Sequence, residues 1–143
     1  MTVKTLTLGP GKLVFGEKDS LTAIETQVTK CVVKPSVKQD DPIPVLSGEK
    51  VPGNRSETAA LAFTIFQDLG ETSSVVEWTW KNAGKEVRFE FVPVKGRGKV
   101  VRGRCTIERS EIGGEVGEKA RADLEFACVT MPTIEDEITG PGV

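Results

Sequence analysis

The chain has 143 residues, a formal net charge of −2 and 38% hydrophobic residues, which indicates one domain with a core of its own. Histidine, the commonest general base and metal ligand, is absent, so an enzyme is not expected and neither a cofactor nor a metal is predicted. No apolar run is long enough to span a membrane, and the near-neutral charge does not favour binding to nucleic acid or anionic lipid.

The first quarter of the chain predicts short strands separated by turns. In order, these are a strand or ordered arm at 2–8, a turn at 9–11, a strand at Lys12–Phe15, a turn at 16–20 and a strand at 21–33. The alternation in the last of these slips near Lys30, which indicates a β-bulge.

The next segment, 34–57, has no helix or strand period and contains four prolines. A loop of this length is uncommon in a compact domain and is usually functional or disordered. The apolar Ile43, Val45 and Leu46 favour a contact arm that reaches another subunit, while a mobile or self-packed loop is the alternative. The expected contact residues are Lys38, Gln39, Asp40, Asp41, Ile43, Val45, Leu46 and Arg55.

A strand, a short helix and a second strand form the centre of the chain. Residues 58–66 and 86–94 alternate with a period of two, as half-buried strands do. Between them, Ser74 and Glu77 have capping-box spacing, Asp68 and Glu71 offer a second possible helix start, and Gly84 is placed to end the helix.

The two tryptophans of this helix cannot share one narrow face. At about 100° per residue, Trp80 aligns with Val76 and Ala83, so we expect Trp80 in the core and Trp78 on another surface. Trp78 is then either half-covered by a neighbouring loop or placed at a subunit contact, where aromatic residues are enriched.

The last third predicts two more strands, at 99–108 and 119–130, each preceded by a Gly-rich turn. Residues 133–143 are acidic and then rich in Gly and Pro, which is typical of a loose tail. The sequence therefore predicts a mainly β domain at 1–132, a β-sandwich or partly closed antiparallel barrel with one flanking helix. Cys31, Cys105 and Cys128 have no metal-type spacing and are expected as buried free thiols of a reducing compartment.

A basic hairpin is the one feature that suggests nucleic acid. It contains Lys95, Arg97, Lys99, Arg102 and Arg104. A single-strand-binding barrel also needs aromatic residues for base stacking, and those nearby are expected in the core. We therefore expect a solvated hairpin with cross-strand pairs to Glu90 or Glu125.

An ordered set of short motifs resembles a known family. The motifs are residues 9–13 (GPGKL), 44–49 (PVLSGE), 64–68 (TIFQD), 76–84 (VEWTWKNAG), 87–93 (VRFEFVP) and 112–118 (IGGEVGE). No single motif is diagnostic, but their order resembles the major tail proteins, or tail tube proteins, of phages with long non-contractile tails.

This resemblance implies a virion structural protein made in the cytoplasm of a bacterial host. Family members form six-membered rings by joining sheets edge to edge, and the rings stack into a tube that conducts DNA. A long loop between early strands, here 34–57, reaches neighbouring subunits. The implied partners are further copies, the tape measure, the tail terminator and the distal tail protein. Residues expected to line the lumen are Glu90, Glu108, Asp123 and Glu125, because acidic or mixed-charge walls do not grip phosphates.

Two rival functions remain open at this stage. A tail terminator or head–tail connector of similar fold would form one ring without polymerising. A nucleic-acid-binding β-barrel would use the basic hairpin at 95–104.

Overall fold

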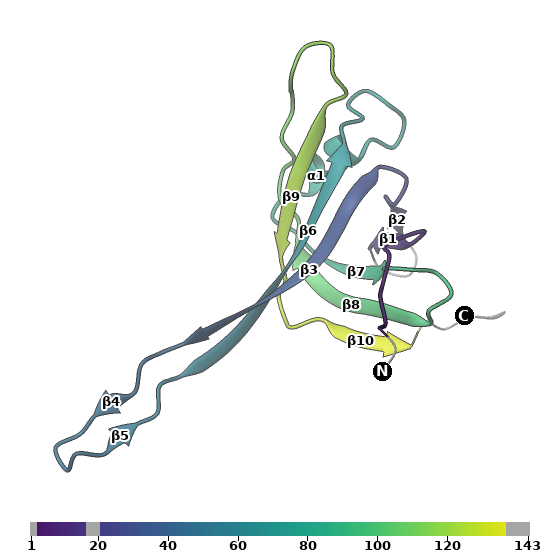
Figure 1. Cartoon of the computed structure of the whole chain (residues 1–143). Helices are drawn as coiled ribbons and strands as arrows, with labels where there is room; N and C mark the ends of the chain where they lie inside the picture. The colour runs from purple at the N-terminus through teal and green to yellow at the C-terminus, as the bar shows by residue number, and fades with distance from the viewer. Residues whose placement is uncertain (1–2, 17–20, 137–143) are drawn as a thin grey trace.

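Two large β-sheets, a two-stranded ribbon and one short helix make up the described part of the molecule. The computed structural model describes residues 3–16 and 21–136 (Figure 1). The elements are β1 (Lys12–Phe15), β2 (Thr22–Ala23), β3 (Val28–Gln39), β4 (Ile43–Pro44), β5 (Lys50–Val51), β6 (Arg55–Phe66), α1 (Val75–Asn82), β7 (Glu86–Val92), β8 (Lys99–Thr106), β9 (Arg121–Ala127) and β10 (Thr133–Asp136). The mainly β fold with one helix is as predicted.

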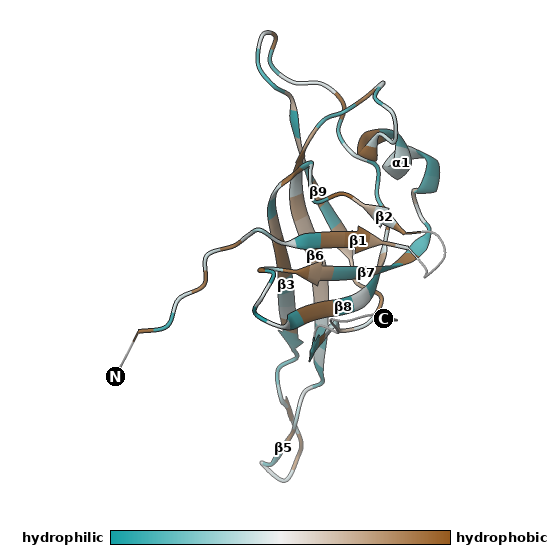
Figure 2. Ribbon diagram, turned by 90° about the vertical axis from the view of Figure 1, so that its right-hand side faces the viewer, coloured by the Kyte–Doolittle hydropathy of each residue, from teal (hydrophilic) through white to brown (hydrophobic). Residues whose placement is uncertain are grey.

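The two sheets cross each other at a steep angle. The five-stranded sheet has the order β10-β8-β7-β1-β2 and the three-stranded sheet has the order β3-β6-β9, with antiparallel pairs throughout. Figure 2 shows β1, β7 and β8 lying across β3, β6 and β9. One antiparallel bridge between Cys105 and Cys128 joins the end of β8 to the chain after β9, so the sandwich is partly closed into a barrel.

Alternating residues of the central strands supply the core. The alternating apolar residues of β6 (Ala59, Leu61, Phe63 and Ile65) and of β9 (Ala122, Leu124 and Phe126) are all buried. From the opposite sheet, the side chains of Leu13, Phe15, Phe89 and Phe91 complete this core. The period of two therefore places the apolar side chains between the sheets, as expected.

The predicted slip in the third strand is a β-bulge. Val28 pairs with Ile65, but Lys30, two residues further on, pairs with the adjacent Thr64. Thr29 is thus the extra residue on β3, and the bulge restores Cys31 to the core face. The expected strand 21–33 is divided into β2, a turn and the start of β3.

Both expected capping signals act on the single helix. The Ser74 hydroxyl accepts from Glu77 N at 3.2 Å, as the capping-box spacing predicts. No helix starts at Asp68; instead its carboxylate accepts from Ser74 Oγ, Val75 N and Val76 N at 2.9, 2.9 and 3.2 Å. Gly84 follows the helix with φ +86°, which confirms the predicted left-handed residue.

The expected positions of the two tryptophans are wrong. Trp78 packs on the core, with its ring centroid 5.3 Å from that of Phe15, while Trp80 is 46% exposed. The buried face of the helix consists of Val75, Val76 and Thr79. Thr79 can be buried because its hydroxyl donates to Val76 O at 2.7 Å.

Segment 34–57 was expected to lack regular structure, and this is also wrong. β3 and β6 continue as an antiparallel ladder from Lys34↔Ala60 to Gln39↔Arg55, and β4 and β5 extend it. The hairpin leaves the body and has no buried face, so its residues show no hydrophobic alternation. Its prolines therefore indicated a loop. In Figure 1 it projects far from both sheets.

Part of the expected loose tail is a strand. Residues Thr133–Asp136 form β10 at the edge of the five-stranded sheet, and they pair with β8 from Thr133↔Arg102 to Asp136↔Lys99. All four residues are exposed, so their sequence does not alternate between buried apolar and exposed polar side chains. The rest of the predicted tail and most of the predicted turn at 16–20 lie outside the described residues.

Residues 3–9 run as an extended segment without strand pairing to other described residues. This agrees with the second of the two forms expected for 2–8, an ordered segment that is not a strand. Figure 2 shows this segment leaving the body before β1. The side chains of Val3, Leu6 and Leu8 are exposed along it.

Candidate assembly surfaces

The long β-hairpin of residues 34–57 is the first candidate surface, and we call it the arm. Its two strands are held beyond the last ladder pair by Asp40 N donating to Asn54 O at 2.8 Å and by Gln39 Nε2 donating to Gly53 O at 3.1 Å. A Cβ at Gly53 would lie 1.9 Å from Asp40 O, so this close approach of the strands requires glycine. The arm is therefore a built structure.

The tip of the arm exposes apolar side chains. Ile43 is 63% exposed and Leu46 is 106% exposed, while Val45 and Val51 are nearly half exposed. A turn closed by Val45 N to Glu49 O at 2.9 Å holds them in place. Exposed apolar residues gathered on one projection are typical of an interaction site.

All eight residues predicted for inter-subunit contact lie on the arm. They are Lys38, Gln39, Asp40, Asp41, Ile43, Val45, Leu46 and Arg55, and each is exposed. Arg55 forms an ion pair with Glu57 on the same strand. The structure therefore brings these residues together on one projecting element, free of the body.

Open sheet edges are the second candidate surface. In the three-stranded sheet, β3 and β9 are the edge strands, and each has a described partner on one side only, apart from the bridge after β9. In the five-stranded sheet, the edge strands are β2 and β10. An open edge presents unpaired N–H and C=O groups that can take another strand. The molecule therefore offers two edges on one sheet from which a larger sheet could grow.

The four acidic residues predicted to line a lumen are separated by the fold. Asp123 and Glu125 lie together on the outer face of the three-stranded sheet, where Asp123 accepts from Thr64 Oγ1 at 2.6 Å. Glu90 lies on the other sheet and pairs with Arg102 at 3.1 Å, and Glu108 follows the end of β8. The four therefore do not share one face.

The helix presents a different aromatic surface from the one predicted. Trp78, expected either under a neighbouring loop or at a subunit contact, is half-buried against the core. Trp80 lies at the surface, where its indole N–H donates to Ser110 O at 2.9 Å and the Arg109 guanidinium lies 5.4 Å from its ring centroid. Helical spacing alone does not distinguish the two tryptophans, since Val75 and Trp78 are three residues apart and Val76 and Trp80 are four apart.

Lys99 and Arg102, two of the five residues of the basic hairpin, form ion pairs with described acidic residues. Arg102 pairs with Glu90, as predicted, and also with Glu135 at 3.5 Å, while Lys99 pairs with Asp136. The ammonium of Lys99 lowers the pKa of the Asp136 carboxyl. The second strand of the hairpin therefore meets acidic partners, two of them supplied by β10.

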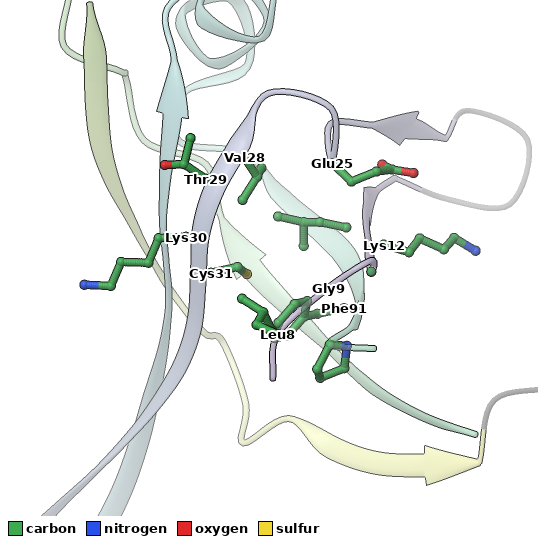
Figure 3. Close-up of a pocket in the computed structure, with 12 residues that line it drawn as sticks. Leu8, Gly9, Lys12, Glu25, Val28, Thr29, Lys30, Cys31 and Phe91 are labelled. Atoms are coloured by element: carbon green, nitrogen blue, oxygen red, sulfur yellow. The ribbon is translucent and has the colours of Figure 1, made fainter. Parts of the chain in front are cut away.

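A cavity of about 170 Å³ opens between the N-terminal segment and β3 (Figure 3). Its lining includes Leu8, Glu25, Val28, Cys31 and Phe91. One carboxylate oxygen of Glu25 has no hydrogen-bond partner among the described residues.

The cysteines are free, as predicted. Burial raises the pKa of Cys31 and of Cys105 to about 12, and raises that of the half-buried Cys128 as well. Within 3–16 and 21–136, no group of three or more Cys, Asp or Glu residues is arranged to hold a metal ion. The described part also has no helix of the length and hydropathy needed to cross a membrane.

Three solved assemblies contain chains of the same fold. One is from the tail of an empty gene transfer agent particle with C6 symmetry, with a TM-score of 0.61 and 13% identity over 87% of this chain and 94% of that one. Another is from the virion of a native gene transfer agent particle (TM-score 0.58, 13% identity, 86% and 95% covered). A third is from the SPP1 tail tube (TM-score 0.59, 15% identity, 90% and 78% covered). No protein-family model and no curated protein matches the sequence.

The molecule therefore shares its β-sandwich fold with chains of solved tail assemblies. It has the fold of the SPP1 tail tube chain, and the fold implied by the ordered sequence motifs is confirmed. At such low identity the likeness concerns the fold, and the arm and edges carry the functional argument.

Proposed function

We propose that the protein is the structural subunit of a phage-type tail tube. Copies join into six-membered rings, and the rings stack into a hollow tube through which DNA passes. The sixfold ring is supported by the C6 symmetry of the gene transfer agent tail whose chain shares the fold. The protein then resides in the virion and is made in the cytoplasm of the bacterial host.

The arm is the observation that carries this proposal. An isolated subunit gains nothing from an ordered hairpin whose apolar tip touches none of its own core, since that surface stays in water. A neighbouring copy or the next ring would bury it. We therefore assign the arm, with Lys38 to Leu46 and Arg55, to contacts between subunits.

The outer face of the three-stranded sheet is our candidate for the lumen wall. If edge-to-edge joining closes a ring, this sheet becomes a continuous wall with its core face turned away from the channel. Asp123 and Glu125 are then wall residues, whereas Glu90 and Glu108 are not on this face. The tape measure, tail terminator and distal tail proteins are the expected partners at the channel and the tube ends.

Electron microscopy of the purified, concentrated protein tests this function. We expect hollow tubes of uniform width with sixfold symmetry in averaged end views. Isolated rings that never stack would indicate a terminator or connector. A protein that stays monomeric at every concentration, and that is absent from purified particles, would refute self-assembly.

A further inference from the structure

The outer face of the three-stranded sheet carries an unusual charge distribution. The ladder register aligns three cross-strand rows on this face: Lys30–Thr64–Asp123, Val32–Ala62–Glu125 and Lys34–Ala60–Ala127. The edge strand β3 thus presents only basic charges, and β9 presents two acids. The central strand β6 between them presents small uncharged side chains.

These opposite charges do not meet within one subunit. Strands are about 4.8 Å apart, so β3 and β9 are separated by about 10 Å across β6. Among the described residues, no ion pair involves Lys30, Lys34, Asp123 or Glu125. Figure 3 shows Lys30 pointing away from the cavity, on the opposite side of β3 from Cys31.

The one basic residue on β9 does not change the negative charge of that edge. Arg121 lies at the start of β9, and its guanidinium is 5.0 Å from the ring centroid of Phe66 on β6. It is therefore drawn toward the central strand by a cation–π contact. Asp123 and Glu125 remain exposed further along β9.

Proline limits where β3 can accept a partner. Pro35 lies within β3 opposite Ala59. Prolines in sheets sit on edge strands with the missing N–H toward the free side, so Pro35 removes one of the donors that β3 offers to a new strand and favours pairing before it. The part of the edge before Pro35 carries both Lys30 and Lys34.

We propose that the β9 edge of one copy joins the β3 edge of the next, with Asp123 and Glu125 forming ion pairs with the neighbour's Lys30 and Lys34. This inference rests on the proposed function and names the surfaces that join. Contacts between two β3 edges or two β9 edges would oppose like charges. The charges thus select head-to-tail joining, which closes rings, over symmetric dimers.

A second consequence concerns the channel. If this face lines the lumen, its lysines would by themselves attract phosphates. Pairing each with a neighbour's carboxylate neutralises it on assembly. The wall then carries balanced charge across each junction, which allows DNA to slide.

Charge reversal tests the proposal directly. The variant K30E/K34E has two acidic edges, and D123K/E125K has two basic edges. Each alone is expected to lose ring and tube formation in electron microscopy and sedimentation. An equimolar mixture of the two is expected to assemble, because every junction in an alternating ring again joins opposite charges.

Two controls match the charge changes at exposed sites elsewhere. K81E/K119E and E115K/E118K change the net charge equally but lie off both edges, and they should assemble as wild type does. Normal assembly by either edge variant alone would overturn the proposal and leave the tube function standing. Failure of the mixture, with both variants folded by circular dichroism, would overturn it as well.

Cross-linking gives a second readout that does not require stable tubes. A zero-length carbodiimide couples amines to carboxylates in contact, and mixing ¹⁴N- and ¹⁵N-labelled protein distinguishes links between copies. We expect such links from Lys30 or Lys34 to Asp123 or Glu125. Links between copies at other sites only would refute the edge assignment, and no links between copies would refute self-association and this inference together.

Discussion

At the residue scale, the two tryptophans show how a short helix divides its faces. Trp78 contacts Phe15 at the centre of an aromatic cluster, in which Phe63 and Phe126 meet edge to face at 5.1 Å. Trp80 instead covers the loop after β8 through its bond to Ser110 O. The two residues are two positions apart, and two steps of about 100° place their side chains about 160° apart around the helix axis.

We predict that Trp78→Ala lowers the free energy of unfolding by about 2–4 kcal/mol, because it leaves a cavity beside Phe15. Trp80→Ala should cost about 1 kcal/mol or less, since its ring is partly in water. Urea unfolding followed by circular dichroism measures both. Equal losses from the two variants would contradict the assignment of Trp78 to the core.

The thiols give a second prediction at this scale. Because burial raises the pKa of Cys31 and Cys105 from 9.0 to about 12, neither forms a reactive thiolate at pH 8. We expect no labelling of these two by a thiol reagent in the native protein, slow labelling of Cys128, and labelling of all three after denaturation. Rapid modification of Cys31 at pH 8 would contradict its burial.

The same pKa shifts link stability to alkaline pH. The folded state holds these protons up to about pH 12, while the unfolded state releases them above 9.0. Their stabilising contribution is therefore complete below pH 9 and falls as the pH rises toward 12.

At the element scale, the arm is separable from the core. Gln39 and Arg55 are directly paired, so a two-residue Asn-Gly turn can close the hairpin there in place of residues 40–54. We expect this shortened variant to stay folded, with a change in unfolding free energy within about 1 kcal/mol, because it removes no buried residue. Tube formation should be lost in electron microscopy.

A point variant separates the apolar tip from the length of the arm. I43S/V45S/L46S keeps the hairpin and removes the exposed apolar side chains, and it should also fail to stack. E49S/K50S changes polar residues of the same tip and is the matched control. Normal tubes from the triple variant would show that the tip is not a contact.

Strand β10 is an element that its own sequence does not predict. Its four residues are exposed, and it is placed by pairing with β8 and by the ion pairs of Asp136 and Glu135 with Lys99 and Arg102. A strand with no buried face has no hydrophobic period, so its position depends on a partner distant in sequence.

At the scale of the whole molecule, charge argues against a DNA-binding role. The net charge is −2, and Lys99 and Arg102 of the basic hairpin are paired with acidic residues. We predict no shift of single- or double-stranded DNA by the unassembled protein at about 0.15 M salt. Salt-sensitive binding that is lost in R97E/R102E would support the rival nucleic-acid-binding barrel.

The ordered motifs indicated the tail tube fold by resemblance, and the residues themselves determined the core strands, the bulge near Lys30 and the Ser74 cap. These features have a local cause, since side chains alternate between a buried and an exposed face or satisfy nearby backbone groups. Only the tertiary structure decided the ladder within the arm, the strand β10 and the separation of the four acids. Each of these depends on which strands pair and which sheet they join, and pairing between distant segments leaves no period in either segment alone.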